Sequence, residues 1–156
     1  MRSNDVFRGL PFNIIQFTTL HEIIAGWLGL ELGHYHHVSD SLHVYHDSLN
    51  DVLSSQRIEI PPNTDRLSAS YDETMRAARS LGALVDLAIC EENSAGSLAN
   101  QFECLELPEA WKNVGSILLF EACRKRGNRE LAKATMSNCT NPTYRLLVER
   151  WVERCR

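Results

Sequence analysis

The side chains best suited to bind a ligand lie in residues 2–14. Arg2 and Ser3 place a guanidinium and a hydroxyl in adjacent positions. A guanidinium can donate two parallel charge-assisted hydrogen bonds to a phosphate, and the hydroxyl adds a further donor. Asn13 offers a donor and an acceptor side by side, which matches the amide-like edge of a pyrimidine. The segment therefore predicts contacts to a phosphate and to a base.

These residue types also allow other interpretations. Arg2 can be only a solvated charge, and Asn13 can be only a helix cap. Five histidines lie between His34 and His46, and imidazole is a good zinc ligand. His-x-His spacing on a strand would place two of them on one face. Because no Asp, Glu or Cys pattern completes a recognised site there, we predict no metal.

A helix is the first element expected to position these side chains. Apolar residues recur near the helical period of about 3.6. They are Ile14, Phe17, Leu20, Ile24 and Leu28. The pattern predicts a helix that begins near Asn13, with Pro11 suited to its start and Gly29 to its end.

A strand is expected after this helix. Residues 35–45 are rich in aromatic and β-branched side chains and contain no proline or glycine. Alternation along a strand puts His43 and Tyr45 on the same face. A short helix is expected from about His46 to Ser54.

The chain changes character near residue 50, and two adjacent prolines, Pro61 and Pro62, interrupt regular structure before the helical part begins. We expect an N-terminal segment at 1–57, a linker at 58–65 and a helical region at 66–156. The fold class expected is α+β. In the last region we expect one helix from Asp72 to about Glu91 and a second from Pro108 to Gly127. A final helix is expected to begin at Asn141-Pro142.

The composition excludes several classes of protein. A net charge of −4 argues against a broad nucleic-acid or membrane surface. The five cysteines form no CxxC pair, which favours a reducing compartment and cysteines used as small core residues. No apolar run approaches the roughly 20 residues of a membrane span. We therefore expect a cytoplasmic protein with no nucleic-acid or membrane partner.

Two motifs resemble those of the thymidylate synthases and the related deoxycytidylate hydroxymethylases. In that family Arg-Ser-x-Asp is followed by Gly-x-Pro-Phe-Asn-Ile, and later by a Leu-x-x-Gly turn and a His-x-Tyr strand. The matching residues are Arg2, Ser3, Asp5, Gly9, Pro11, Phe12, Asn13, Ile14, Leu30, Gly33, His43 and Tyr45. The resemblance covers residues 1 to about 48. It implies part of a mixed sheet with a long helix, followed here by the helical region.

The resemblance implies a role for each site residue. Arg2 and Ser3 would hold the phosphate of a deoxyuridylate. His43 and Tyr45 would hydrogen-bond the 3′-hydroxyl of its deoxyribose.

The base would be held by two further residues. Asp5 would bind through its backbone near the pyrimidine. Asn13 would hydrogen-bond the base and favour uracil over cytosine, because the deoxycytidylate hydroxymethylases have Asp at that point.

The chain departs from the family pattern in three places. The nucleophilic cysteine of the family lies about twenty residues before the arginine that Arg2 matches, so we expect this chain to be a fragment or an incomplete form without a catalytic residue. Residues 39–41 are Ser-Asp-Ser where the family has Gly-Gly-Asp. Residues 50–156 lack the later strands and the tail that closes over the folate.

Three functions follow from these observations. The first is methylation of dUMP to dTMP with methylenetetrahydrofolate, by a protein that is a homodimer as the family members are. A hydroxymethylase acting on a pyrimidine nucleotide is a variant of it. The second is a non-catalytic protein that binds a pyrimidine nucleotide. The third is a helical interaction module, with the first fifty or so residues as scaffold.

Overall fold

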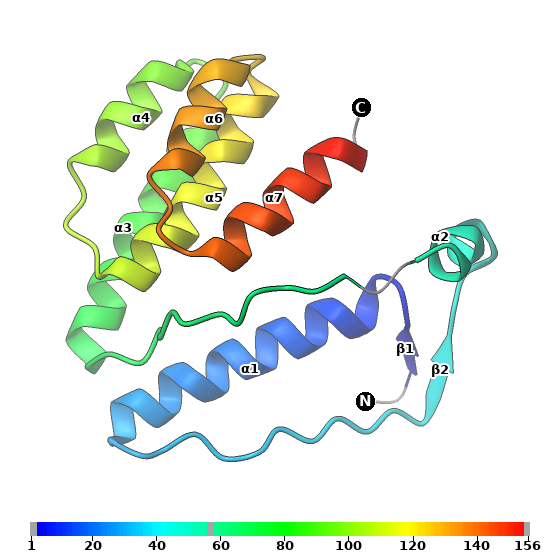
Figure 1. Cartoon of the computed structure of the whole chain (residues 1–156). Coiled ribbons are helices and arrows are strands. Elements are labelled where there is room, and N and C mark those ends of the chain that lie inside the picture. The colour runs from blue at the N-terminus through cyan, green and yellow to red at the C-terminus, as the bar shows by residue number, and fades with distance from the viewer. Residues whose placement is uncertain (1–2, 56–57, 155–156) are drawn as a thin grey trace. The chain divides into compact units, whose positions relative to one another are not determined.

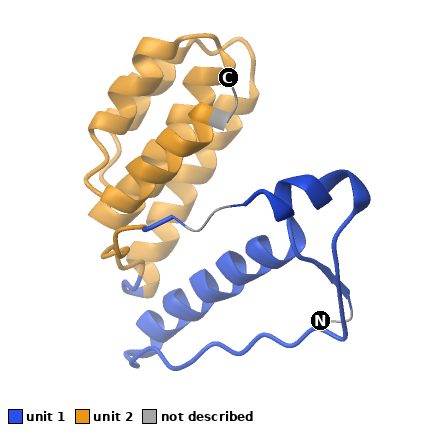
Figure 2. Ribbon diagram, turned by 45° about the vertical axis from the view of Figure 1, so that its right-hand side comes forward, with its two compact units in different colours: residues 1–59, 68–70 blue, residues 60–67, 71–156 orange. Residues whose placement is uncertain are grey.

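The computed structural model describes residues 3–55 and 58–154 and divides into two compact units (Figure 2). Unit 1 comprises residues 1–59 and 68–70, and unit 2 comprises residues 60–67 and 71–156. Helices and a small parallel sheet are both present, so the expected α+β class is confirmed. Among the described residues, no helix is long and apolar enough to cross a membrane.

Unit 1 is organised around two short parallel strands, which are joined by a long crossover (Figure 1). Its elements are β1 (Ser3–Asp5), α1 (Gly9–Leu28), β2 (Ser41–His43), the 3-10 turn η1 (His46–Ser48) and α2 (Leu49–Leu53). In the register of the sheet, Ser3 lies opposite Ser41 and Asp5 opposite His43. Parallel strands need a crossover of a dozen or more residues, and α1 with the extended segment after it provides one.

Helix α1 begins earlier than the predicted Asn13, at Gly9. The carboxylate of Asp5 accepts hydrogen bonds from the backbone N–H groups of Arg8 and Gly9, which satisfies donors that a helix start leaves free. Pro11 then fits within the first turn, where no N–H donor is required. The predicted end is confirmed, because Gly29 takes a left-handed conformation with φ of 64° directly after Leu28.

The strand predicted for residues 35–45 is wrong in its length. Only Ser41–His43 form a strand, and residues 30–39 have no regular structure. Strand propensity alone does not make a strand, because its backbone groups need a partner. β1 offers three residues, and β2 has the same length. The short helix predicted after the strand is confirmed as η1 followed by α2.

Unit 2 is a helical bundle, as expected for the C-terminal region. Its helices are α3 (Tyr71–Ile89), α4 (Ala95–Glu103), α5 (Glu109–Lys125), α6 (Arg129–Ser137) and α7 (Pro142–Arg154). α5 packs against each of the other four helices, and its buried residues include Trp111, Phe120 and Cys123. At Gly115 a Cβ atom would lie 2.4 Å from the ring of Phe102, so glycine permits the close approach of α4.

The predicted helix ends in unit 2 are largely confirmed. The side chain of Asn141 accepts a hydrogen bond from Tyr144 N at 3.2 Å, with Pro142 as the first helical residue. Gly127 follows α5 with φ of 74°. Asp72 is not the cap of α3, because it already lies in the first turn. The starts of α4 and α6, which the sequence analysis did not locate, are capped by the side chains of Ser94 and Asn128.

Buried amides attach the proline-containing segment at residues 60–67 to the bundle. The Asn113 amide of α5 donates to Asp65 Oδ2 at 2.9 Å and accepts from Thr140 N at 2.9 Å. Asn141 donates to Asn63 Oδ1 at 2.6 Å. Asn113 and Asn141 are 2% and 1% exposed, so leaving either amide unpaired would cost about 1–3 kcal/mol. These bonds therefore fix the segment against α5 and α7.

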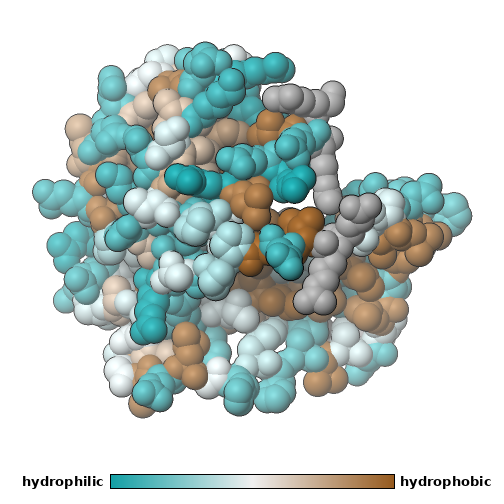
Figure 3. Space-filling model, in the orientation of Figure 1, coloured by the Kyte–Doolittle hydropathy of each residue, from teal (hydrophilic) through white to brown (hydrophobic). Residues whose placement is uncertain are grey.

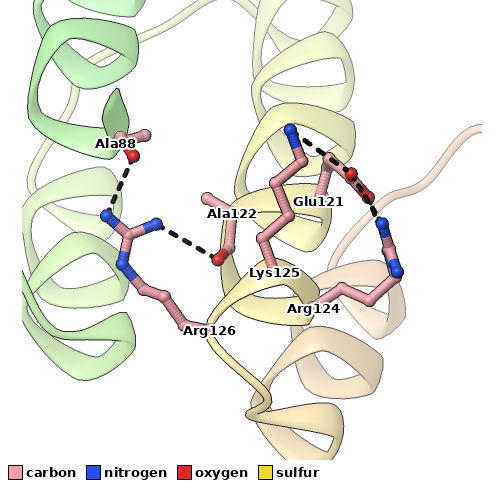
Figure 4. Close-up of polar contacts among 6 residues, drawn as sticks. All are labelled: Ala88, Glu121, Ala122, Arg124, Lys125 and Arg126. Atoms are coloured by element: carbon pink, nitrogen blue, oxygen red, sulfur yellow. Dashed lines mark hydrogen bonds and ion pairs between the residues drawn. The ribbon is translucent and has the colours of Figure 1, made fainter. Parts of the chain in front are cut away.

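Arg126, just after α5, closes the end of α3 (Figure 4). Its guanidinium donates to the carbonyl oxygens of Ala88 at 2.8 Å, Cys90 at 2.9 Å and Asn93 at 2.7 Å. A fourth bond reaches Ala122 O at 3.3 Å. The last carbonyls of a helix have no partner within it, and the positive charge also suits the helix dipole. Arg126 thus joins α3, the loop after it and α5.

We predict that Arg126→Lys destabilises unit 2 by about 1.5–3 kcal/mol, because one ammonium cannot bond carbonyls that a planar fork reaches together. Urea unfolding followed by tryptophan fluorescence in a Trp27→Phe background, where the remaining Trp111 and Trp151 both belong to unit 2, would measure this. Arg129→Lys, at an exposed position in the first turn of α6, is the matched control and should leave the midpoint unchanged. Equal midpoints for the two variants would contradict the role of Arg126.

Candidate functional site

Pairing of β1 with β2 brings three of the residues singled out from the sequence together. Ser3 Oγ lies 3.3 Å from His43 Nδ1, although the two residues are 40 positions apart. The rings of His43 and Tyr45 meet edge to face, with centroids 5.1 Å apart. A hydroxyl, an imidazole and a phenol are therefore clustered at the end of β2. Arg2, the fourth member expected here, lies outside the described residues.

Asp5 has a second role that the sequence analysis did not assign to it. Asp5 is 8% exposed, and its carboxylate accepts hydrogen bonds from the N–H groups of Arg8 and Gly9 at the start of α1. Burial raises the pKa of this carboxyl, but the hydrogen bonds from Arg8, Phe7 and Gly9 outweigh it, and the pKa is lowered overall. Asp5 Oδ1 is buried without a hydrogen-bond partner among the described residues. The side chain thus holds β1 and α1 in a fixed relation.

Asn13 lies inside α1 and is oriented by a residue that the sequence analysis missed. Its Nδ2 donates to Asn4 Oδ1 at 3.0 Å. Asn4 Nδ2 in turn lies 3.1 Å from His37 Nε2, and His37 Nδ1 lies 2.9 Å from the hydroxyl of Tyr35. We call these four side chains the amide relay. The sequence offered no signal for this role beyond a polar residue between Ser3 and Asp5.

The small size of Gly9 makes room for the amide relay. A Cβ atom at this position would lie 2.5 Å from Asn4 Oδ1, so any other residue would force the Asn4 amide to move from its present position. Asn4 itself is 3% exposed. β1 therefore connects the two groups of side chains, because Ser3 bonds to His43 and its neighbour Asn4 bonds to Asn13.

The histidine-rich segment does not gather into a metal centre. Among the described residues, no group of three or more His, Cys, Asp and Glu side chains could hold a metal ion. His37 is already bonded through both ring nitrogens, and His34 and His36 contact each other edge to face. An open hollow of about 490 Å³ lies beside them. It is lined by Phe17, Leu20, His21, Ile24, Tyr35, His36, His37 and Val38.

The family model of thymidylate synthase matches residues 1–79, which is just over half of the 156 residues. The chain belongs to the thymidylate synthase family. The match contains all six residues singled out from the sequence, Arg2, Ser3, Asp5, Asn13, His43 and Tyr45. The resemblance noted in the sequence is thus confirmed, and it extends beyond the predicted limit near residue 48.

Individual relatives match parts of the same region. The chain is 51% identical over 47 residues to a deoxyuridylate hydroxymethyltransferase of Bacillus phage SP01, covering 30% of this chain and 12% of the relative. It is 40% identical over 63 residues to a thymidylate synthase of Bacillus licheniformis, covering 38% of this chain and 23% of the relative. It is 39% identical over 51 residues to a thymidylate synthase of Listeria monocytogenes, covering 33% of this chain and 16% of the relative. The chain thus spans less than a quarter of the length of these curated relatives.

The cysteines lie outside the residues that match the thymidylate synthase family. The first of the five is Cys90. Cys123 and Cys139 are buried core residues, and burial raises the pKa of both thiols, which keeps them protonated and unreactive. Cys90 and Cys104 are exposed in unit 2, and Cys155 lies outside the described residues. The expectation of cysteines as core residues is confirmed for the two buried ones.

We predict that Asp5→Asn weakens the start of α1 at neutral pH and has less effect in acid. A carboxyl with a lowered pKa in the fold stabilises it above the ordinary aspartate pKa of about 3.9, and this contribution is lost as the pH falls further. Hydrogen-exchange protection of the first-turn amides of α1 would measure it at pH 7 and pH 3. Asp40→Asn, at an exposed position, is the control. A loss of protection in Asp5→Asn that is as large at pH 3 as at pH 7 would refute the carboxylate's role.

Proposed function

We propose that unit 1 is the part of a thymidylate synthase-type enzyme that binds dUMP. The observation that carries the proposal is the approach of Ser3 to His43 across the β1–β2 pair, with Tyr45 beside them. Ser3 donates to the phosphate together with Arg2. His43 and Tyr45 bond the 3′-hydroxyl of the sugar. Each of these contacts needs a donor or acceptor that the residue type supplies.

The base is recognised by Asn13. An asparagine amide can accept from the N3–H of uracil through its oxygen and donate to O4 through its nitrogen. Cytosine has an acceptor at N3 and a donor at N4, so the same amide orientation opposes it. Asp5 contributes its backbone near the pyrimidine, which the capping bonds of its side chain hold in position.

The reaction proposed is transfer of a one-carbon unit from methylenetetrahydrofolate to C5 of dUMP, which loses its C5 proton. The tetrahydrofolate then supplies the hydride that reduces this unit to the methyl group of dTMP and leaves as dihydrofolate. A thiolate must first add to the ring, and residues 1–79 contain no cysteine. The nucleophile is therefore supplied from outside these residues. Without one, the same contacts make a binding protein for a pyrimidine nucleotide.

A second reaction is favoured by one relative. The phage SP01 protein with 51% identity over 47 residues is a deoxyuridylate hydroxymethyltransferase. Hydroxymethylation of dUMP uses the same nucleotide, so the contacts of Ser3, Asn13, His43 and Tyr45 apply to both reactions. Mass analysis of the nucleotide after turnover would separate the two, because the hydroxymethyl product is heavier by one oxygen.

Homodimer formation fits the surface of unit 1, which exposes many large apolar residues. They include residues that are each between 58% and 74% exposed, namely Phe12, Ile15, Leu28, Leu30, Val38, Leu42 and Leu53. Figure 3 shows hydrophobic side chains at the surface in the region of the short strands and α2. Exposed apolar surface on this scale is typical of contact with another protein surface. We propose that a second subunit covers it, in a cytoplasmic enzyme.

We predict that the full chain binds dUMP, with Ser3→Ala and His43→Ala each weakening binding about tenfold or more through the loss of a charge-assisted or polar contact. Isothermal titration calorimetry measures this directly. Lys133→Ala, an exposed lysine of α6, is the matched control and should bind as the wild type does. Absence of heat even at millimolar dUMP would exclude the proposed site.

A swap at Asn13 tests the base contact separately. We predict that Asn13→Asp reverses the preference from dUMP to dCMP, because a protonated carboxyl can donate to N3 of cytosine and accept from its amino group. Competition between the two nucleotides in the same titration would report the ratio of affinities. An unchanged ratio would mean that Asn13 does not touch the base.

A further inference from the structure

We propose that Asn4 and His37 determine uracil specificity, by fixing the orientation of the Asn13 amide. Neither residue belongs to the nucleotide contacts described above. The inference rests on the proposed dUMP site, since it concerns which pyrimidine that site accepts. Asn4 and His37 are therefore positioning residues, which act on the base through Asn13.

The amide relay has a defined direction. Asn4 Nδ2 can only donate, so the His37 Nε2 atom 3.1 Å away must accept. The proton of neutral His37 then resides on Nδ1, which donates to the Tyr35 hydroxyl at 2.9 Å. At the other end of Asn4, Oδ1 accepts from Asn13 Nδ2 at 3.0 Å. The donations thus run in one direction, from Asn13 through Asn4 and His37 to Tyr35, and the His37 tautomer and the two amide orientations depend on one another.

The direction of the relay decides which way Asn13 presents its amide. If Asn13 turned over, its Oδ1 would face Asn4 Oδ1, and two acceptors would oppose each other. If Asn4 turned as well, its Oδ1 would face His37 Nε2, so His37 would have to move its proton to Nε2 and the Tyr35 hydroxyl would have to donate to Nδ1 instead of accepting from it. In the orientation that the structure has, Asn13 Oδ1 can accept and the second Nδ2 hydrogen can donate. That arrangement pairs with N3–H and O4 of uracil and opposes cytosine.

Burial makes this orientation costly to change. Asn4 is 3% exposed, so water cannot replace a lost partner, and each unpaired group would carry a desolvation penalty. Gly9 leaves no free space beside Asn4 Oδ1, since a Cβ there would already overlap it. The backbone of Asn4 is held in β1, opposite Leu42 of β2. The relay is therefore rigid before any nucleotide binds.

Two substitutions of similar size separate positioning from simple packing. Asn4→Asp keeps an acceptor for Asn13 Nδ2, and His37 can take its other tautomer and donate to the second carboxylate oxygen. Asn4→Leu removes both polar atoms and leaves the Asn13 amide free to turn. The quantity to measure is the ratio of the dissociation constants for dCMP and dUMP, because general damage to the site affects both nucleotides alike.

We expect the wild type to favour dUMP and Asn4→Asp to keep that preference. In Asn4→Leu the ratio should fall roughly tenfold, which corresponds to the loss of one hydrogen bond to a fixed amide. His37→Phe, which removes the acceptor but keeps Asn4, should also lower the ratio, and it serves if Asn4→Leu fails to fold. An equal loss in Asn4→Asp and Asn4→Leu, or no loss in Asn4→Leu and His37→Phe, would overturn the proposal.

A measurement without nucleotide distinguishes failure of the relay from failure of the dUMP site. Nitrogen-15 NMR of the full chain should find neutral His37 protonated at Nδ1 in the wild type and at Nε2 in Asn4→Asp. Protonation at Nε2 in the wild type would overturn the relay. If His37 shows the expected tautomers but neither nucleotide binds, the proposed dUMP site is refuted, and the specificity role with it.

Discussion

The parallel pairing of β1 with β2 is the contact on which the rest of unit 1 depends. It joins residues at the start of the chain to residues 38 positions later, in the register Ser3 to Ser41. Without it Ser3 would not meet His43, and Asn4 would not be buried next to His37. Three residues a side give few ladder hydrogen bonds, so side-chain contacts must add to the pairing. The Asp5 carboxylate adds one such contact, because it holds the first turn of α1 against β1.

Local signals in the sequence predicted the ends of elements better than their extent. Gly29, Gly127 and Asn141-Pro142 were correct because a left-handed residue or a capping side chain acts within a few residues of chain. The strand at 35–45 was too long because the available partner, β1, is short, and no local pattern reveals a partner's length. The start of α1 was predicted too late because Asp5 was not considered as its capping residue. Aspartate is a common capping residue, and here its carboxylate accepts the N–H groups of Arg8 and Gly9.

The sequence likewise predicted only part of the candidate site, because it reveals local signals but not contacts between distant segments. A motif identifies residues by type and spacing, so Ser3, Asp5, Asn13, His43 and Tyr45 could be named from the sequence. Asn4 and His37 fall at positions that the motif leaves unspecified, and their importance comes from contacts between distant segments. The sequence alone could state that Asn4 is a polar residue within the first motif. It could not state that its two ends meet an asparagine of α1 and a histidine after α1.

The two units differ in how much of their stability comes from their own core. Among the described residues, the buried hydrophobic side chains of unit 1 are Ile23 and Ala25, whereas unit 2 has a continuous core around α5. Unit 1 instead buries polar groups, Asn4, Asp5 and Ser48, which stabilise only while their hydrogen bonds are kept. Any molecule that binds the folded form alone adds stability by mass action. A bound molecule or a partner surface would therefore stabilise unit 1 more than unit 2, because unit 1 has the smaller hydrophobic core and exposes more of its large apolar side chains.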